Sequence, residues 1–197
     1  MTKPNVFIIE TLDFDDEKAD RFEGKVLSKI LRLNGIESEY YYIRTNRELD
    51  EIIGKFDESD FRYLHISCHG SPVSLETTFD SIPFDELGKI LSPCLDKKRV
   101  FVSACEMVNK DLADALISDS ECYSVIGPSE PVVFSVATIF WASFYHLMFS
   151  DNDSAMKREE IRTVLGKITD LFGVPVNYYS KSKKLGIKKV EYRPSGT

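Results

Sequence analysis

The chain has 197 residues, of which 43% are hydrophobic and 29% charged, and this balance excludes wholesale disorder. The formal net charge of −7 argues against nucleic acid as a partner. We expect one domain over residues 1–197, a length that is typical of a single α/β domain. The four cysteines form no CxxC pair and no secretory segment precedes Val6, so we expect a cytoplasmic protein.

The charge is unevenly distributed along the chain. Residues 177–197 contain six bases and one acid, so this basic C-terminal segment carries +5 and the rest carries −12. By contrast, Val132–Phe149 has 18 residues without a formal charge, which is long enough for a membrane span. Because polar residues such as Ser135 and His146 interrupt it and Glu130 flanks it, we predict a core helix and no membrane contact.

The first part of the chain alternates strand and helix patterns. A buried strand over Val6–Glu10 leads into the acidic loop Thr11–Glu17 and a helix-period stretch that ends at Asn34-Gly35. A second strand over Ile36–Arg44 is followed by a short helix that Asn46 caps. This order predicts parallel strands joined by helical crossovers.

The second part repeats the alternation. In chain order, we predict a strand over Tyr63–Cys68, a turn from His69 and a loop or small hairpin through Asp80, a helix over Pro83–Leu91, a strand over Arg99–Ala104, a helix over Asn109–Leu116, a strand over Tyr123–Gly127, the helix Val132–Phe149 and a helix over about 155–172. The fold class is therefore α/β, a three-layer sandwich with a mostly parallel central sheet flanked by helices. Ligands bind beyond the carboxyl ends of such strands, where His69 and Cys105 both lie.

A cysteine beside a histidine suits nucleophilic chemistry, because the thiolate is the reactive form and a base must remove the proton. The helix after Cys105 offers amides that favour negative charge. Taken alone, His69 and Cys105 each also suit a structural role at a strand end. We expect a structural role for His65 as well, within its strand. A zinc site made of Cys68, His69 and Cys105 lacks close ligand pairs and a fourth ligand, so we expect no metal, and we expect no cofactor.

Two segments carry a family resemblance. Leu64–Gly70 and Val100–Glu106 resemble the catalytic motifs of the caspase-like clan of cysteine peptidases, most closely its CHAT branch, which is related to separase. Ala137-Thr138 and Phe144-Tyr145 are similar to a helix of CHAT domains, so that the likeness runs from Tyr63 to Phe149. The resemblance implies His69 as general base, Cys105 as nucleophile, and amides near Gly70 and Cys105 as the oxyanion site.

The resemblance implies a cysteine endopeptidase, of bacterial origin, that acts on a protein or peptide substrate. Acids at the expected mouth of the site favour cleavage after Arg or Lys; these substrate-binding candidates are Glu130, Asp13, Asp15 and Asp16. The first alternative is a catalytically inactive caspase-like scaffold that binds or regulates a partner protein. The second is an unrelated flavodoxin-like domain.

Overall fold

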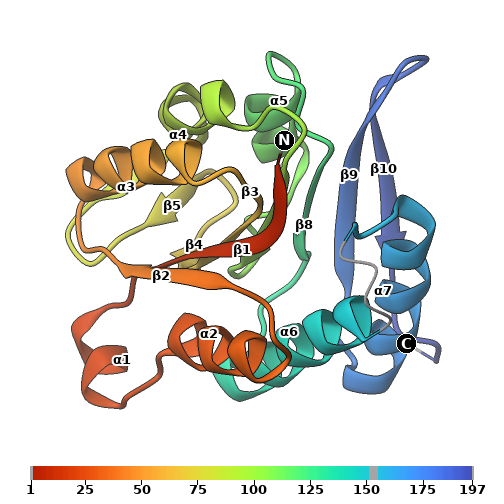
Figure 1. Cartoon of the computed structure of the whole chain (residues 1–197), viewed down its shortest axis with the longest axis horizontal. Helices are drawn as coiled ribbons and strands as arrows, with labels where there is room; N and C mark the ends of the chain where they lie inside the picture. The colour runs from red at the N-terminus through yellow and green to blue at the C-terminus, as the bar shows by residue number, and fades with distance from the viewer. Residues whose placement is uncertain (1, 151–154, 197) are drawn as a thin grey trace.

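The computed structural model describes residues 2–150 and 155–196, and its main sheet has seven strands in the order β10-β9-β8-β7-β3-β1-β2 (Figure 1). The strands are β1 (Lys3–Glu10), β2 (Ser38–Tyr42), β3 (Phe61–Ser67), β7 (Arg99–Ser103), β8 (Ser124–Pro128), β9 (Val176–Ser182) and β10 (Gly186–Tyr192). Each contact from β2 to β8 is parallel, whereas β9 and β10 pair antiparallel. The predicted mostly parallel sheet is confirmed.

Helices cover both faces of this sheet. They are α1 (Phe14–Lys18), α2 (Glu23–Leu33), α3 (Asn46–Glu58), α4 (Phe84–Leu91), the 3₁₀ turn η1 (Ser92–Cys94), α5 (Lys110–Ile117), α6 (Phe134–Phe149) and α7 (Arg158–Phe172). Core residues of α3, α4 and α5 pack on one face, and those of α2, α6 and α7 on the other (Figure 1). The predicted three-layer α/β sandwich is confirmed.

Local sequence signals set the helix ends, and the cap of α3 differs from expectation. Thr45 caps α3, because its hydroxyl accepts from the Glu48 amide while the Glu48 carboxylate accepts from the Thr45 amide. Asn46, predicted as the cap, is instead the first residue of the helix. At the end of α2, Gly35 adopts φ +73°, which agrees with the predicted stop.

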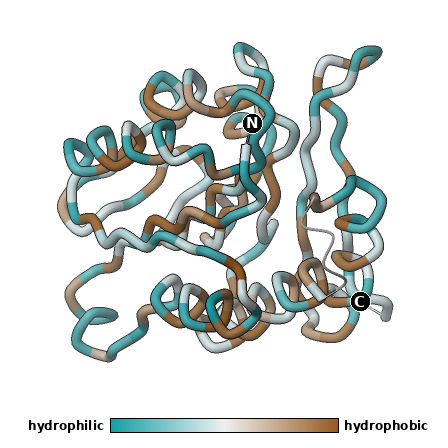
Figure 2. Tube along the Cα trace, in the orientation of Figure 1, coloured by the Kyte–Doolittle hydropathy of each residue, from teal (hydrophilic) through white to brown (hydrophobic). Residues whose placement is uncertain are grey.

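The predicted core helix is α6. Its aromatic residues Trp141, Phe144 and Tyr145 are fully buried and surround Phe101 of β7. Figure 2 shows the hydrophobic residues concentrated along the central strands that α6 covers. Among the described residues, no helix has the length and hydropathy that a bilayer crossing needs.

The sequence did not predict the strands of the basic C-terminal segment, whereas a small hairpin after His69 was one of the two alternatives given for that loop. The basic segment forms β9 and β10, a hairpin whose Gly186 has φ +67° after a three-residue turn. The loop after His69 forms a small separate sheet of β4 (His69–Gly70), β5 (Ser74–Glu76) and β6 (Ser81–Pro83). The hairpin extends the main sheet, and the small sheet lies beside the end of β3.

Gly127 of β8 tests how tightly this sheet packs. A Cβ at Gly127 would lie 2.3 Å from the carbonyl oxygen of Val102 and 2.6 Å from a methyl of Val108. We expect Gly127→Ala to lower the free energy of unfolding by about 2 kcal/mol or more, because the neighbouring backbone must shift. Gly166→Ala, in α7 with open space around it, should raise it by about 0.5–1 kcal/mol. Urea denaturation measures both, and equal stability of Gly127→Ala and wild type would contradict this packing.

Candidate functional site

The register between β3 and β7 places the ends of both strands side by side. Ser67 lies opposite Ser103, and the Cys68 amide donates to the Ser103 carbonyl at 3.1 Å. His69 and Cys105 follow these paired serines by two residues each. Both line one cavity of about 90 Å³, called here the small cavity. The structure therefore brings the two predicted residues together at the carboxyl edge of the sheet.

A buried carboxylate holds the His69 ring. Its Nε2 lies 2.5 Å from Asp16 Oδ2, and the other oxygen of Asp16 accepts from Arg21 at 2.6 Å. The Asp16 side chain is only 6% exposed, and Asp13, which caps α1, fixes it by accepting from its amide. The Phe134 ring packs against the imidazole in a T-shaped contact. With Nε2 occupied, Nδ1 is the nitrogen that remains to accept a proton.

Cys105 lies in a tight loop between β7 and α5. The thiol is half-buried, 3.9 Å from the Val132 carbonyl, and the next residue, Glu106, adopts φ +55°. Such a left-handed angle is strained for a residue with a side chain, and strain of this kind is frequent at functional sites. Asn109 caps α5 and also donates to the Pro72 carbonyl at 2.7 Å. That bond ties the loop after Cys105 to the loop after His69.

Gly70 permits the close approach of the two loops. A Cβ there would lie 3.1 Å from Met107 Sδ and 3.3 Å from Ala104 Cβ. A larger residue at position 70 would push the loop that carries Cys105 away from His69.

The other three cysteines lie in less reactive surroundings. Burial raises the pKa of the Cys68 thiol well above its usual range and that of Cys122 to about 12. Burial also raises the pKa of Cys94. All four are free thiols, but Cys105 alone among them is a half-exposed thiol that shares a cavity with a histidine.

The acids predicted to bind substrate fall into different places. Asp13 lies 3.7 Å from His69 Nε2, and Asp16 holds the same nitrogen. Asp15 is exposed on α1. Glu130 pairs with Arg193 at 3.3 Å and does not line the small cavity. Two of the four acids therefore face the histidine.

Glu23, at the start of α2, is a site residue that sequence reasoning missed. Its side chain is buried and lines both the small cavity and an adjoining open hollow of about 450 Å³. It accepts from Ser103 at 2.9 Å, while its second oxygen lies 3.6 Å from Nε2 of the buried His65. An acid in the first turn of an amphipathic helix reads as a surface residue, so no sequence signal marked it.

Three ligand atoms near His69 gather closely enough to hold a metal ion. In the described part of the chain, the side chains of Asp13, Asp16 and His69 offer atoms within 4.8 Å of one another. Asp16 and His69 already hydrogen-bond each other, and exposed acids such as Asp13 are common without a metal. The absence of a metal stays a prediction.

Glu10 anchors α2, and hence Glu23, at the end of β1. This fully buried carboxylate accepts from the Gly24 amide at 2.7 Å and from the Tyr40 hydroxyl at 2.8 Å. Burial raises the pKa of Glu10 from 4.5 to about 7, because desolvation outweighs these hydrogen bonds.

This raised pKa predicts a pH dependence of stability. Between pH 4.5 and about 7 the folded chain keeps a proton on Glu10 that the unfolded chain releases. The stabilisation is complete below pH 4.5 and is lost as the pH rises through 7. Relative to Glu10→Gln, the free energy of unfolding of the wild type should fall by about 3 kcal/mol across this window. Urea titrations at each pH measure it. Glu58→Gln, on the exposed end of α3, is the matched control, and a wild-type profile parallel to that of Glu10→Gln would contradict the assignment.

No protein-family profile and no curated protein matches this chain. Among solved structures, it is similar to the two-electron reduced flavodoxin of Megasphaera elsdenii, with 18% identity and a TM-score of 0.34, over 62% of this chain and 82% of that one. It is also similar to a flavone reductase, with 10% identity and a TM-score of 0.43, over 85% of this chain and 64% of that one. At these identities the likeness concerns the fold alone.

These comparisons contradict the predicted place in the caspase-like clan. The similar structures include a flavodoxin and a flavone reductase, so the predictions of a cysteine endopeptidase and of an inactive caspase-like scaffold are both corrected. The physical reason lies in the shortness of the motifs. The strands of a parallel α/β sheet end in short loops of small and polar residues. His-Gly and Ser-Ala-Cys can therefore occur in such loops without common ancestry.

Proposed function

We propose that the chain is a thiol-dependent catalyst in which the sulfur of Cys105 binds covalently to a small acyl substrate. One observation carries the proposal: a half-buried thiol shares a cavity with a histidine that a buried carboxylate holds. Nucleophile, base and orienting acid in this order form a catalytic arrangement that recurs on unrelated folds.

The geometry supports the following steps. Nδ1 of His69 takes the thiol proton, and the thiolate of Cys105 attacks the carbonyl carbon of the substrate, so the carbonyl electron pair moves to oxygen. Amides near Gly70 and Cys105 hold this oxyanion. When it collapses, the leaving group departs with the proton from His69. The acyl group then passes from sulfur to an acceptor, and Asp16 acts as a positioning residue throughout.

The dimensions of the site favour a small acyl group. The small cavity of about 90 Å³ is well below the roughly 300 Å³ of a pocket that encloses a drug-sized ligand. The open hollow beside it, lined by Arg21, Phe22 and Phe134, offers room for the rest of the substrate. A reacting group of a few atoms in the small cavity, with its carrier in the hollow, fits both volumes.

A flavin nucleotide does not fit the residues at this edge. Flavodoxin-like sheets bind FMN at the switch point beside the first strand, where its phosphate needs free amides. Here the loop after β1 carries Asp13, Asp15 and Asp16, and Asp13 already occupies the Asp16 amide. These carboxylates repel a phosphate, so no step of the proposed reaction passes through a flavin.

This disagreement gives a direct binding test. Titrating FMN with the protein should leave the flavin fluorescence unchanged at equimolar concentrations, because the acidic loop disfavours the phosphate. Asp13→Asn and Asp15→Asn together remove two of these charges and serve as the comparison. Tight quenching by the wild type would contradict the exclusion of a flavin.

The proposed centre predicts selective thiol reactivity. Near neutral pH, iodoacetamide should modify Cys105 faster than Cys68, Cys94 or Cys122, because burial disfavours the thiolate at those three. Removing the base in His69→Gln should slow the labelling of Cys105 at least about tenfold. Asp16→Asn should slow it less, since it leaves the imidazole in place. Peptide mapping by mass spectrometry measures each rate.

A matched control keeps this test specific. Cys94→Ser removes a partly exposed thiol outside the small cavity and should leave Cys105 labelling unchanged. Turnover of small aryl thioesters should vanish in Cys105→Ser and fall with His69→Gln. Labelling of Cys105 that is indifferent to His69→Gln would contradict the proposed pair.

A second candidate is thiol oxidation, favoured by Cys68, which lines the same cavity as Cys105. A peroxide would oxidise the Cys105 thiolate to a sulfenic acid while its own O–O bond is reduced, and Cys68 would then displace water to form a disulfide. The raised pKa of Cys68 opposes the second step. A Cys68–Cys105 disulfide after peroxide treatment, without thioester turnover, identifies this candidate.

A further inference from the structure

The outer edge of β10 is open. β10 is the last strand of the main sheet and pairs only with β9 in the described part of the chain. An edge strand points alternate amide and carbonyl groups outward, and these groups can pair with another extended chain. About half of the seven residues 186–192 offer such groups, because the others turn theirs toward β9. This length matches a typical strand, so the edge has room for a complete partner strand.

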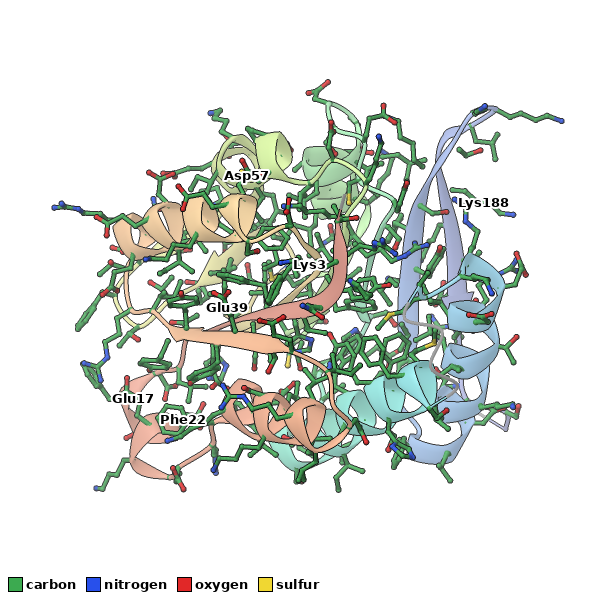
Figure 3. The ribbon with its side chains drawn as sticks, in the orientation of Figure 1. Lys3, Glu17, Phe22, Glu39, Asp57 and Lys188 are labelled. Atoms are coloured by element: carbon green, nitrogen blue, oxygen red, sulfur yellow. The ribbon has the colours of Figure 1, made fainter. Side chains whose placement is uncertain are left out.

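The hairpin that carries this edge is strongly basic. Residues 176–192 have five bases and a single acid, Glu191, and a sixth base, Arg193, follows directly. Lys183, Lys184 and Lys188 are exposed and make no contact with an acid among the described residues. Figure 3 shows Lys188 on the hairpin, on the opposite side of the molecule from Glu17 and Phe22 near the candidate site. The positive charge is therefore separate from the acidic edge.

A hollow at the turn extends the basic surface. It has a volume of about 750 Å³, and four bases line it: Arg158, Lys181, Lys183 and Lys184. Glu121 offsets one of them, because it pairs with Lys181 at 2.6 Å. The remaining three bases leave a net positive potential where the hairpin leaves the body of the molecule.

The same lysines disfavour a second copy of this chain. An antiparallel pair of β10 strands centred on Lys188 or on Lys189 would set that lysine opposite its own copy, and like charges across a strand pair destabilise it. An acidic strand would meet the same side chains with opposite charge. The faces of β10 also suit a partner: Ile187 packs toward one side of the sheet, and Val190 and Tyr192 toward the other. A partner strand that alternates acidic and apolar residues can turn its acids toward the face of Lys188 and its apolar residues toward the face of Ile187.

We propose that β10 binds an acidic, extended peptide segment of another protein, which adds to the main sheet as an eighth strand. Backbone hydrogen bonds supply the pairing, and Lys183, Lys184 and Lys188 select the negative charge. The proposal is independent of the chemistry at Cys105, since the hairpin contributes no residue to the small cavity.

The test uses a fluorescent peptide of about seven residues in which Glu and Val alternate. Anisotropy titration with the full chain at low salt should show saturable binding, and hydrogen exchange should slow at the amides of β10. Lys188→Glu should weaken the affinity about tenfold. Lys29→Glu, the same charge reversal on the exposed face of α2, should leave it unchanged.

Three comparisons can overturn the proposal. A peptide methylated on alternate backbone nitrogens keeps its charge but cannot pair, so equal binding of this peptide would show that charge alone acts. If the chain dimerises and Lys188→Glu abolishes the dimer, a second copy of the chain is the occupant of the β10 edge. If vesicles containing phosphatidylserine bind the hairpin and the acidic peptide does not, the partner is a membrane. Absence of saturable peptide binding at low salt would also contradict the proposal.

Discussion

The parallel pairing of β3 with β7 is the constraint on which the candidate site depends. All five residues of β7 and six of the seven in β3 are buried, with helices packed on both faces. A slip of one residue would turn every side chain to the opposite face, so the register is firmly fixed. Because Ser67 and Ser103 are held opposite each other, His69 and Cys105 must leave the sheet side by side. Core packing thus sets where the two residues leave the sheet, and the loop contacts of Gly70 and Asn109 complete their placement.

Three buried carboxylates lie at this edge, and the desolvation of each is compensated by different partners. Glu10 accepts backbone amides of α2 and shifts its pKa to about 7. Asp16 is held by a histidine and an arginine. Glu23 satisfies one oxygen through Ser103 and faces a buried imidazole with the other. A buried charge left partly unsatisfied is costly, and such costs are tolerated most often where chemistry needs them. The three carboxylates thus concentrate buried negative charge at the edge that holds the candidate site.

The sequence predicts the alternating core of the fold well, because strand and helix periods are local signals. The hairpin was not predicted, because the lysines in the segment Lys181–Lys189 hide the strand pattern. These two strands are explained only by their place at the antiparallel edge of the sheet. The Asp16–His69 contact joins residues 53 positions apart, and no local pattern reports a contact of that kind. The short motifs around His69 and Cys105 correctly indicated a shared cavity, yet they misidentified the family. A few residues at two strand ends reflect the edge of a parallel sheet and are no evidence of common ancestry.

The two ends of the molecule differ in charge as well as in chemistry. Seven acids and two bases lie between Glu10 and Glu23, at the edge that holds the candidate site, whereas the β9–β10 hairpin is basic (Figure 3). Screening at physiological salt limits exposed charges to about 8 Å, so each region acts separately on what approaches it. An anionic segment is repelled from the small cavity and attracted to the hairpin. A partner anchored at β10, as proposed, would therefore leave the cavity open to a small substrate.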